Sequence, residues 1–174
     1  MSSQNDISSN NLEVKILERS DDLSTFDCGK DDVMGLNEFI HFEAHQFQKE
    51  NLGVTHLFLY NKQIVGFATL AMSQIEIKLA QYILPIKVKI KYYPALEIGR
   101  LAIHNDYRGR HVGRCVCLWC LSLAKRLSKD VGCRLIVVLT EGKPVEFYKK
   151  CGFEVVPKYE NKQRKWMFLQ VPQE

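Results

Sequence analysis

Basic and glycine residues that follow an apolar segment have the composition of a phosphate-binding loop. Residues 96–114 read LEIGRLAIHNDYRGRHVGR, so an expected strand passes through a polar turn into a loop that opens a long helix. Small residues let backbone N–H groups approach an anion, and the positive end of the helix dipole adds attraction. Arg108, Arg110 and Arg114 place positive charge around the same point. The spacing therefore predicts a site for a phosphorylated ligand.

Two side chains of the preceding strand region are candidates for proton transfer. Glu97 lies inside the apolar run ALEIGRLAI, on the face that Leu101 and Ile103 share by the period of two. A carboxylate in such a strand is costly unless it is paired or used, so it is either a general base or the partner of Arg100 or of a neighbouring lysine. His104, just past the strand, is either a proton relay or loop surface.

Length and composition indicate one globular domain. The chain has 174 residues, of which 46% are hydrophobic and 25% charged, with a formal net charge of +4. No apolar run approaches the ~20 residues that cross a bilayer, so we expect no membrane partner. Residues 1–11 are polar and are expected to form a disordered lead-in to a domain over residues 12–174.

The cysteines indicate a reducing compartment rather than a disulfide framework or a metal centre. We expect reduced thiols in the cytoplasm, since nothing in the N-terminal segment resembles a signal peptide. Cys115, Cys117 and Cys120 suggest a metal cluster, but at about 100° per residue they cannot converge from one helix. Cys133 and Cys151 are expected to be small core residues, and no metal is expected.

Two groups of basic residues lie outside the loop. They are Lys87, Lys89 and Lys91, in KVKIKYYP, and Lys158, Lys162, Arg164 and Lys165 near the C-terminus. The first group is typical of a solvated edge strand that lysines protect from association. The alternative is a basic surface that binds a polyanion such as tRNA.

Hydrophobic periodicity predicts a mixed α/β fold with about seven strands and about four helices. The strands are expected over residues 12–17, 54–60, 64–73, 95–103, 133–139, 153–156 and 166–171. The helices are expected over residues 31–49, part of 79–93, 112–131 and 144–151. Asp31 or Asp32 is expected to cap the first helix, and Gly35 to weaken or split it. Gly132 is expected to end the helix over 112–131, whose apolar stripe is Val112, Val116, Trp119, Leu123 and Leu127.

The loop resembles the coenzyme A pyrophosphate loop of the GNAT N-acetyltransferase superfamily, Q/R-x-x-G-x-G/A. Arg108 matches its first position and Gly113 its last, whereas His111 stands where the family has glycine. That side chain would either crowd the pyrophosphate or donate a hydrogen bond to it. Residues 147–153, FYKKCGF, resemble the family's FY-xxx-GF element. The resemblance spans residues 12–171 and implies the GNAT fold, with a mixed, mostly antiparallel sheet.

The resemblance also implies acetyl-CoA as cosubstrate and direct transfer of its acetyl group to a primary amine in a ternary complex. The implied cofactor residues are Leu101, Ala102, Ile103, Arg108, Gly109, Arg110, His111, Val112, Gly113 and Arg114. A backbone N–H at the strand end would polarise the acetyl carbonyl. Tyr148 would protonate the leaving thiolate, or else is an amphipathic core tyrosine. Glu97 matches a glutamate that serves as base in histone-acetylating members, although other members use an ordered water.

Further segments resemble the GNAT branch that contains the toxins of toxin–antitoxin pairs. They are FDCG at residues 26–29, LNEF at 36–39, IVGFATL at 64–70 and YPALEIGRLA at 93–102. This resemblance implies acetylation of the amino group of charged tRNA, dimerisation, and neutralisation by a small ribbon-helix-helix antitoxin. Three functions remain open: an enzyme for a small or protein amine, a tRNA-directed toxin, and a catalytically silent acyl-CoA-binding module.

Overall fold

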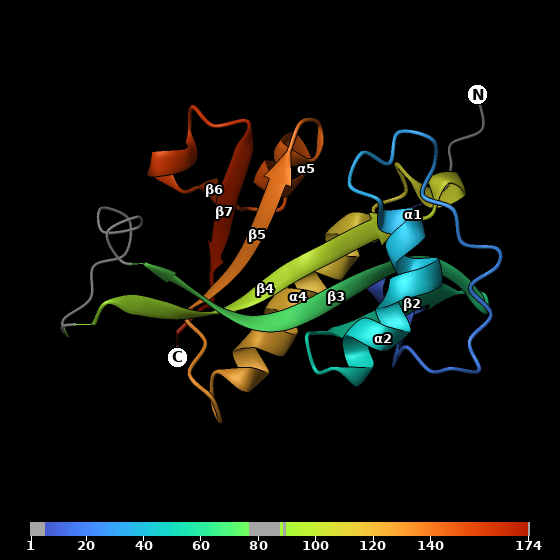
Figure 1. Cartoon of the computed structure of the whole chain (residues 1–174), viewed down its shortest axis with the longest axis horizontal. Helices are drawn as coiled ribbons and strands as arrows, with labels where there is room; N and C mark the ends of the chain where they lie inside the picture. Colours follow the sequence, from blue (N-terminus) through green and yellow to red (C-terminus); the bar gives the residue numbers. More distant parts are fainter. Residues whose placement is uncertain (1–5, 77–87, 89, 174) are drawn as a thin grey trace. The chain divides into compact units, whose positions relative to one another are not determined.

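The strands form one mixed sheet with the order β1-β2-β3-β4-β5-β7-β6 (Figure 1). The computed structural model describes residues 6–76, 88 and 90–173. The pairs β1–β2, β2–β3, β5–β7 and β6–β7 are antiparallel, and the pair β4–β5 is parallel. The strands are β1 (Glu13–Ile16), β2 (Val54–Tyr60), β3 (Gln63–Glu76), β4 (Tyr92–Ile103), β5 (Leu135–Glu141), β6 (Glu154–Val155) and β7 (Arg164–Gln170). The predicted seven-stranded α/β fold is confirmed.

Three stretches of joined helical turns accompany the strands in the described part of the chain. The first combines α1 (Leu36–Glu38), a π-helical segment (Phe39–Glu43) and α2 (Ala44–Lys49). The others are α4 (Val112–Leu127) and α5 (Pro144–Lys150). None of these helices is long and apolar enough to span a membrane. The helix expected within residues 79–93 falls mostly outside the described residues, as do Lys87 and Lys89.

The chain divides into two compact units, each discontinuous in sequence. The first contains Met1–Ala71 and Gly99–Leu118, and the second Met72–Ile98 and Trp119–Glu174. Strands β3 and β4 and helix α4 each contribute residues to both units. Each unit has its own buried apolar cluster.

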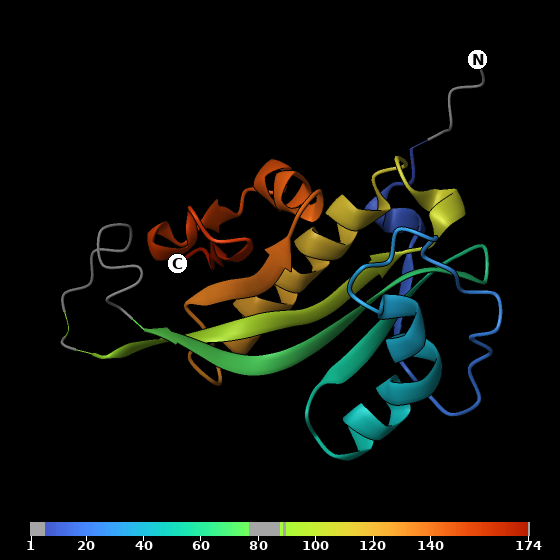
Figure 2. The same cartoon turned by 45° about the horizontal axis from the view of Figure 1, so that its top comes forward.

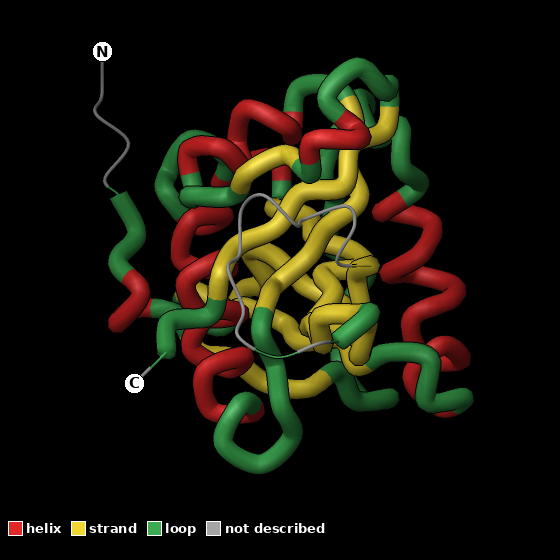
Figure 3. The backbone as a smooth tube through the Cα atoms, turned by 90° about the vertical axis from the view of Figure 1, so that its left-hand side faces the viewer, coloured by secondary structure: helices red, strands yellow, loops and turns green. Residues whose placement is uncertain are grey.

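In the first unit, the helical segment 36–49 covers one face of β2 and β3, and the first turns of α4 lie on the other (Figures 1 and 3). The cluster under segment 36–49 includes Phe39, Ile40, Leu57 and Phe67, all at most 2% exposed. The predicted β2–β3 hairpin is confirmed. Asn61 and Lys62 at its turn both have positive φ, as a turn that matches the twist of the strands requires.

The first helix begins at Leu36, later than the sequence predicted. Gly35 has a left-handed conformation with φ 66°, so it precedes the helix rather than splitting it. Asp32 still supplies the cap, because its carboxylate accepts from the N–H groups of Leu36 at 2.8 Å and Asn37 at 2.7 Å. The irregularity that was expected at Gly35 occurs instead in the π-helical segment, where Phe42 is 81% exposed.

In the second unit, β5 pairs with β7 along its full length, and β7 pairs with β6. Helix α5 ends as expected, because Gly152 takes φ 92° and the N–H of Phe153 donates to the Tyr148 carbonyl at 3.0 Å. The buried cluster of this unit includes Ala95, Leu135, Val137 and Phe168. The near-continuous burial of successive β5 residues is typical of a strand whose two faces are both covered.

The predictions for α4 need two corrections. The helix ends at Leu127, and Gly132 does not adopt the left-handed conformation of a helix C-cap. Its most buried face contains small residues, and Trp119 and Leu123 are only half-buried. The fully buried positions are Val112, Val116, Cys117, Cys120 and Ala124. Small side chains on this face allow the helix to approach the strands closely.

We predict that Asp32→Ala lowers the free energy of unfolding by about 1 kcal/mol, because two N–H groups at the helix start lose their acceptor. Chemical denaturation followed by circular dichroism would measure the change. Asp130→Ala is the matched control, since Asp130 is exposed and its carboxylate makes no contact within the described residues. Equal losses in the two variants would contradict a capping role for Asp32.

Candidate functional site

The loop before α4 has two left-handed residues, which make its backbone concave. Gly109 has φ 73° and His111 has φ 63°, and α4 begins at the next residue, Val112. Left-handed residues next to right-handed ones turn successive N–H groups toward one point, which forms a nest for an anion. The first N–H groups of a helix also have no carbonyl partner within that helix. The predicted phosphate-binding loop therefore has a backbone geometry suited to an anion.

His111 keeps a glycine-like backbone, although it has a side chain where the GNAT loop has glycine. Its imidazole Nδ1 lies 3.1 Å from a carboxylate oxygen of Asp6, and both side chains are more than half exposed. A non-glycine residue in the left-handed region costs roughly 1–2 kcal/mol, and histidine tolerates this region better than most residues. The contact with Asp6 shows a third outcome for this side chain, besides the two that the sequence suggested.

The N-terminal segment packs against this loop, as Figure 2 shows. Ile7 is only 3% exposed, its N–H donates to the Arg110 carbonyl at 3.0 Å, and its own carbonyl accepts from the Cys115 thiol at 3.6 Å. Residues 9–11 then form a short 3-10 turn. Residues 6–8 thus belong to the candidate site. Their only signal in the sequence is Ile7, a single apolar residue in a polar run.

The arginines of the loop have different surroundings. Arg108 pairs with Asp31 at 2.9 Å and donates to the Cys28 carbonyl, so its guanidinium ties the loop to the FDCG turn. The guanidinium of Arg110 lies 5.2 Å from the centroid of the Tyr107 ring, within cation–π range. Arg114 is exposed on the first turn of α4. Arg108 therefore positions the loop through contacts with the protein itself.

Further contacts hold the end of β4 beside β3 and beside the FDCG turn. A Cβ on Gly66 would lie 2.9 Å from Ile103 Cδ1 and 3.0 Å from the Ala102 carbonyl oxygen, so only glycine allows this approach. The N–H of His104 donates to the Val65 carbonyl at 2.9 Å. Both ring nitrogens of His104 also have local partners, the Thr25 carbonyl and the N–H of Asp106. These contacts favour a structural role for His104 over a proton relay.

The β4 backbone leaves its partner strand before it reaches the loop. The parallel pairs with β5 end at Glu97 and Val137, although β4 continues to Ile103. On that edge, the backbone groups of residues 98–103 have no partner in β5. An unpaired strand edge offers N–H and C=O groups to an extended ligand. This segment includes Leu101, Ala102 and Ile103, for which the GNAT resemblance implies cofactor binding.

The Glu97 carboxylate forms no ion pair or hydrogen bond with any described residue, and the residue is half-buried. The suggested pairing with Arg100 is wrong. The guanidinium of Arg100 lies 4.9 Å from the centroid of the Phe39 ring and donates to the Gly99 carbonyl at 2.9 Å. A half-buried carboxylate with no protein partner remains a candidate base.

Tyr148 is 5% exposed and lies on α5 in the second unit. Its ring makes edge contacts with Phe147 and Phe153, with centroids 5.1 and 5.2 Å away. This packing fixes the ring plane, which both the acid role and the core role require. Among the predicted residues, the structure brings the loop and the end of β4 together in the first unit, whereas Glu97 and Tyr148 belong to the second.

None of the cysteines forms a disulfide, and burial raises the pKa of the Cys28, Cys115, Cys120 and Cys133 thiols. Burial is the main cause that raises the pKa of Cys120 to about 12 and that of Cys28 to about 11. Within the described part of the chain, no group of three or more metal-ligating side chains comes together. These thiols are therefore poor nucleophiles, consistent with the core role expected for such residues.

Comparison with known proteins gives one family and a set of similar structures. The family model described as "Acetyltransferase (GNAT) domain" matches residues 53–155. The search of curated proteins gives no match. AtaTR bound with AcCoA is similar at TM-score 0.74 and 26% identity, over 93% of this chain and 95% of that chain.

Two further structures are similar over most of their length. AtaT complexed with acetyl-methionyl-tRNAfMet has TM-score 0.74 and 25% identity, over 89% of this chain and 93% of that chain. A mutant of KacT has TM-score 0.77 and 22% identity, over 92% of this chain and 95% of that chain, and shows the shared fold.

We predict that Ile7→Ala loosens the loop without unfolding the chain. Truncation of a buried isoleucine removes on the order of 2–5 kcal/mol of packing, and at a chain end this loss falls on local opening. Hydrogen exchange should therefore become at least about tenfold faster at the amides of residues 110–115. Ile16→Ala is the control, since Ile16 is 51% exposed. Uniform acceleration across the chain, or none in the loop, would contradict the anchoring role.

Proposed function

The chain belongs to the acetyltransferase (GNAT) family, and from this premise we propose that it transfers the acetyl group of acetyl-CoA to the α-amino group of aminoacyl-tRNA. The backbone nest before α4 is the observation that supports the donor, because it offers N–H groups where a pyrophosphate is expected. The acceptor rests on the similarity to AtaT, whose structure contains acetyl-methionyl-tRNAfMet. We treat residues 12–174 as one acetyltransferase domain, with residues 6–8 supporting its loop.

Donor binding, in this proposal, relies mainly on backbone groups. The N–H groups of residues 109–114 hold the pyrophosphate, and Arg110 and Arg114 add charge. The unpaired edge of Leu101–Ala102–Ile103 holds the extended arm of the cosubstrate by strand-like hydrogen bonds. One N–H at this edge polarises the acetyl carbonyl as negative charge develops on its oxygen.

Two side chains carry the proton transfers in this proposal. Glu97 accepts a proton from the attacking amine, which must be neutral to form the new C–N bond. Tyr148 donates its hydroxyl proton to the sulfur as the C–S bond breaks. The products are then the N-acetylated acceptor and the free thiol of coenzyme A. The lack of an ion pair between the Glu97 carboxylate and any described residue, and the packed ring of Tyr148, support these assignments.

A second copy of the chain and a small antitoxin are proposed partners. AtaT has been solved with the C-terminus of its antitoxin AtaR, which supports a comparable partner here. A small protein encoded beside this chain should suppress acetyl transfer at a stoichiometric concentration. Full activity in its presence would remove that protein as the antitoxin, and ultracentrifugation would test self-association.

The function is tested by acetyl transfer from labelled acetyl-CoA to a total charged tRNA pool. Polyamines, free amino acids and a lysine peptide serve as parallel acceptors. Label on charged tRNA, lost when the tRNA is deacylated beforehand, would support the proposal. Label only on a small amine or peptide would make the chain an acetyltransferase for that acceptor. Tight acetyl-CoA binding without any transfer would instead support the silent acyl-CoA-binding module.

Tyr148→Phe should lower kcat by at least about tenfold and leave the Kd for acetyl-CoA nearly unchanged, since it removes one proton donor and keeps the ring. Steady-state kinetics and calorimetry measure the two quantities. Tyr159→Phe is the matched control from the same unit, where Tyr159 packs at the edge of the buried cluster. A normal kcat for Tyr148→Phe would remove Tyr148 from the mechanism.

Glu97→Gln should reduce the rate most at low pH. An α-amino group has a pKa of about 7.7–8.0, so below this range most of the acceptor is protonated and needs a base. Above it the amine arrives neutral, and the deficit of the variant should shrink. The pH profile of kcat/KM measures this. A deficit that is constant across pH would show that Glu97 acts in some way other than as a base for the amine.

A further inference from the structure

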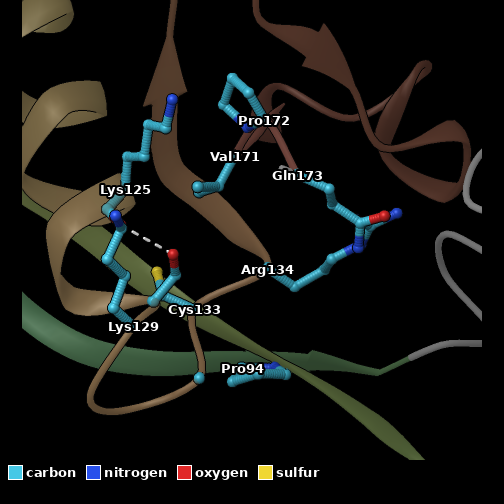
Figure 4. Close-up of a pocket in the computed structure, with 10 residues that line it drawn as sticks. Pro94, Lys125, Lys129, Cys133, Arg134, Val171, Pro172 and Gln173 are labelled. Atoms are coloured by element: carbon cyan, nitrogen blue, oxygen red, sulfur yellow. Dashed lines mark hydrogen bonds between the residues drawn. The ribbon is translucent and has the colours of Figure 1, made fainter.

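A pocket in the second unit is lined by none of the residues assigned to acetyl transfer. Its volume is about 450 Å³, and it is open to solvent. The end of α4, the turn that follows, the start of β4 and the C-terminal segment form its walls (Figure 4). The lining residues include Pro94, Lys125, Lys129, Arg134, Val171 and Gln173.

The charged residues that line this pocket are all cationic. Among the described residues, Lys125, Lys129 and Arg134 line it, and no aspartate or glutamate does. Figure 4 shows the lysines at the side formed by α4 and Arg134 at the opposite side, where β5 begins. Positive groups that face one cavity from two elements repel each other unless an anion lies between them.

Arg134 has a buried donor without an acceptor. Its Nε is buried and has no hydrogen-bond partner among the described residues. Its backbone is firmly held, because its N–H donates to the Pro94 carbonyl at 2.8 Å and its carbonyl accepts from the Val171 N–H at 3.0 Å. A buried donor left unsatisfied costs about 1–3 kcal/mol, which a bound acceptor would recover. Arg134 is therefore fixed at its backbone, lines the pocket, and has a buried Nε without an acceptor among the described residues.

The helix dipole explains only part of this charge. The C-terminus of a helix attracts cations, which accounts for the lysines at the end of α4. It does not account for Arg134, which comes from the start of β5 rather than from the helix. Arg126 also lies in the last turn of α4 but does not line the pocket. The cavity thus combines cations from separate elements, beyond what the helix end requires.

We propose that this pocket binds a phosphate group of a larger ligand. Arginine matches phosphate with a planar fork of donors, and lysine adds a strongly hydrated point charge. The volume exceeds that of one phosphate, and Pro94, Val171 and Pro172 give an apolar surface for the atoms attached to it. The group is either a phosphodiester of RNA or the phosphate of a small molecule. The proposal does not depend on the acetyl acceptor.

The test measures binding of two probes that contain neither an amino acid nor an acetyl donor. The probes are a short RNA duplex and inorganic phosphate, titrated while amide resonances of residues 128–134 and 171–173 are observed. The pocket variant combines Lys125→Gln, Lys129→Gln and Arg134→Gln. The control variant combines Arg126→Gln, Arg19→Gln and Lys49→Gln, which removes the same charge from exposed positions outside the pocket.

The pocket variant should bind at least about tenfold more weakly than the control variant, with a log K against log salt slope reduced by about 0.9 for each lost RNA phosphate contact. Selective loss of RNA binding identifies a phosphodiester ligand, and selective loss of phosphate binding a small one. Equal losses in both variants, or no binding of either probe to the unmodified chain, would overturn the proposal. If the pocket variant does not fold, the single variant Arg134→Lys is used, which keeps the positive charge but removes the planar guanidinium. Unchanged phosphate and RNA binding by this variant would also overturn the proposal.

Discussion

The candidate site depends on the backbone turn between β4 and α4. Gly109 and His111 both take left-handed conformations there, and the chain can enter α4 at Val112 only after this turn. The strand before the turn is fixed by the close approach of Gly66 to the end of β4. The loop itself is fixed by the pairing of Arg108 with Asp31. The anion binding that we propose for this loop therefore relies on backbone direction, which these contacts hold, more than on the charges of the loop.

The departure at His111 and the packing of the N-terminal segment are best understood together. A histidine in the left-handed region gives up roughly 1–2 kcal/mol that glycine would not. The contact of its imidazole with Asp6 and the burial of Ile7 place stabilising interactions at the same loop. An exposed ion pair alone contributes little, about 0–1 kcal/mol, so the buried isoleucine is the larger compensation. The substitution that looked like a defect in the sequence is thus accommodated by a segment that no loop motif includes.

Patterns that repeat along the chain were predictable, and single contacts between distant segments were not. Apolar segments on both sides of the turn at residues 61–63 predicted β2, β3 and their hairpin, because several residues of each strand give the same signal, although β3 extends to Glu76 rather than residue 73. The predicted start of the first helix was wrong, because the Asp32 carboxylate caps N–H groups beyond Gly35, at Leu36 and Asn37. Helix propensities of single residues do not predict such a contact. Ile7 was missed because one apolar residue has no period. In the candidate site, the loop was predicted from its basic and glycine residues. The contacts of Arg100 with Phe39 and of His111 with Asp6 could not be predicted, because they join residues far apart in the sequence.

The dipole of α4 attracts an anion at the N-terminus of the helix and repels it at the C-terminus. At the N-terminus the dipole carries about +0.5 charge, so backbone N–H groups suffice and the attraction is short-ranged. At the C-terminus the dipole carries about −0.5 charge, so a phosphate there must be held by side chains that outweigh it. Lys125, Lys129 and Arg134 provide this positive charge around the pocket of the second unit. Phosphate binding at the pocket of the second unit should therefore weaken steeply with added salt. Phosphate binding at the loop before α4, which relies on backbone N–H groups, should depend less on salt.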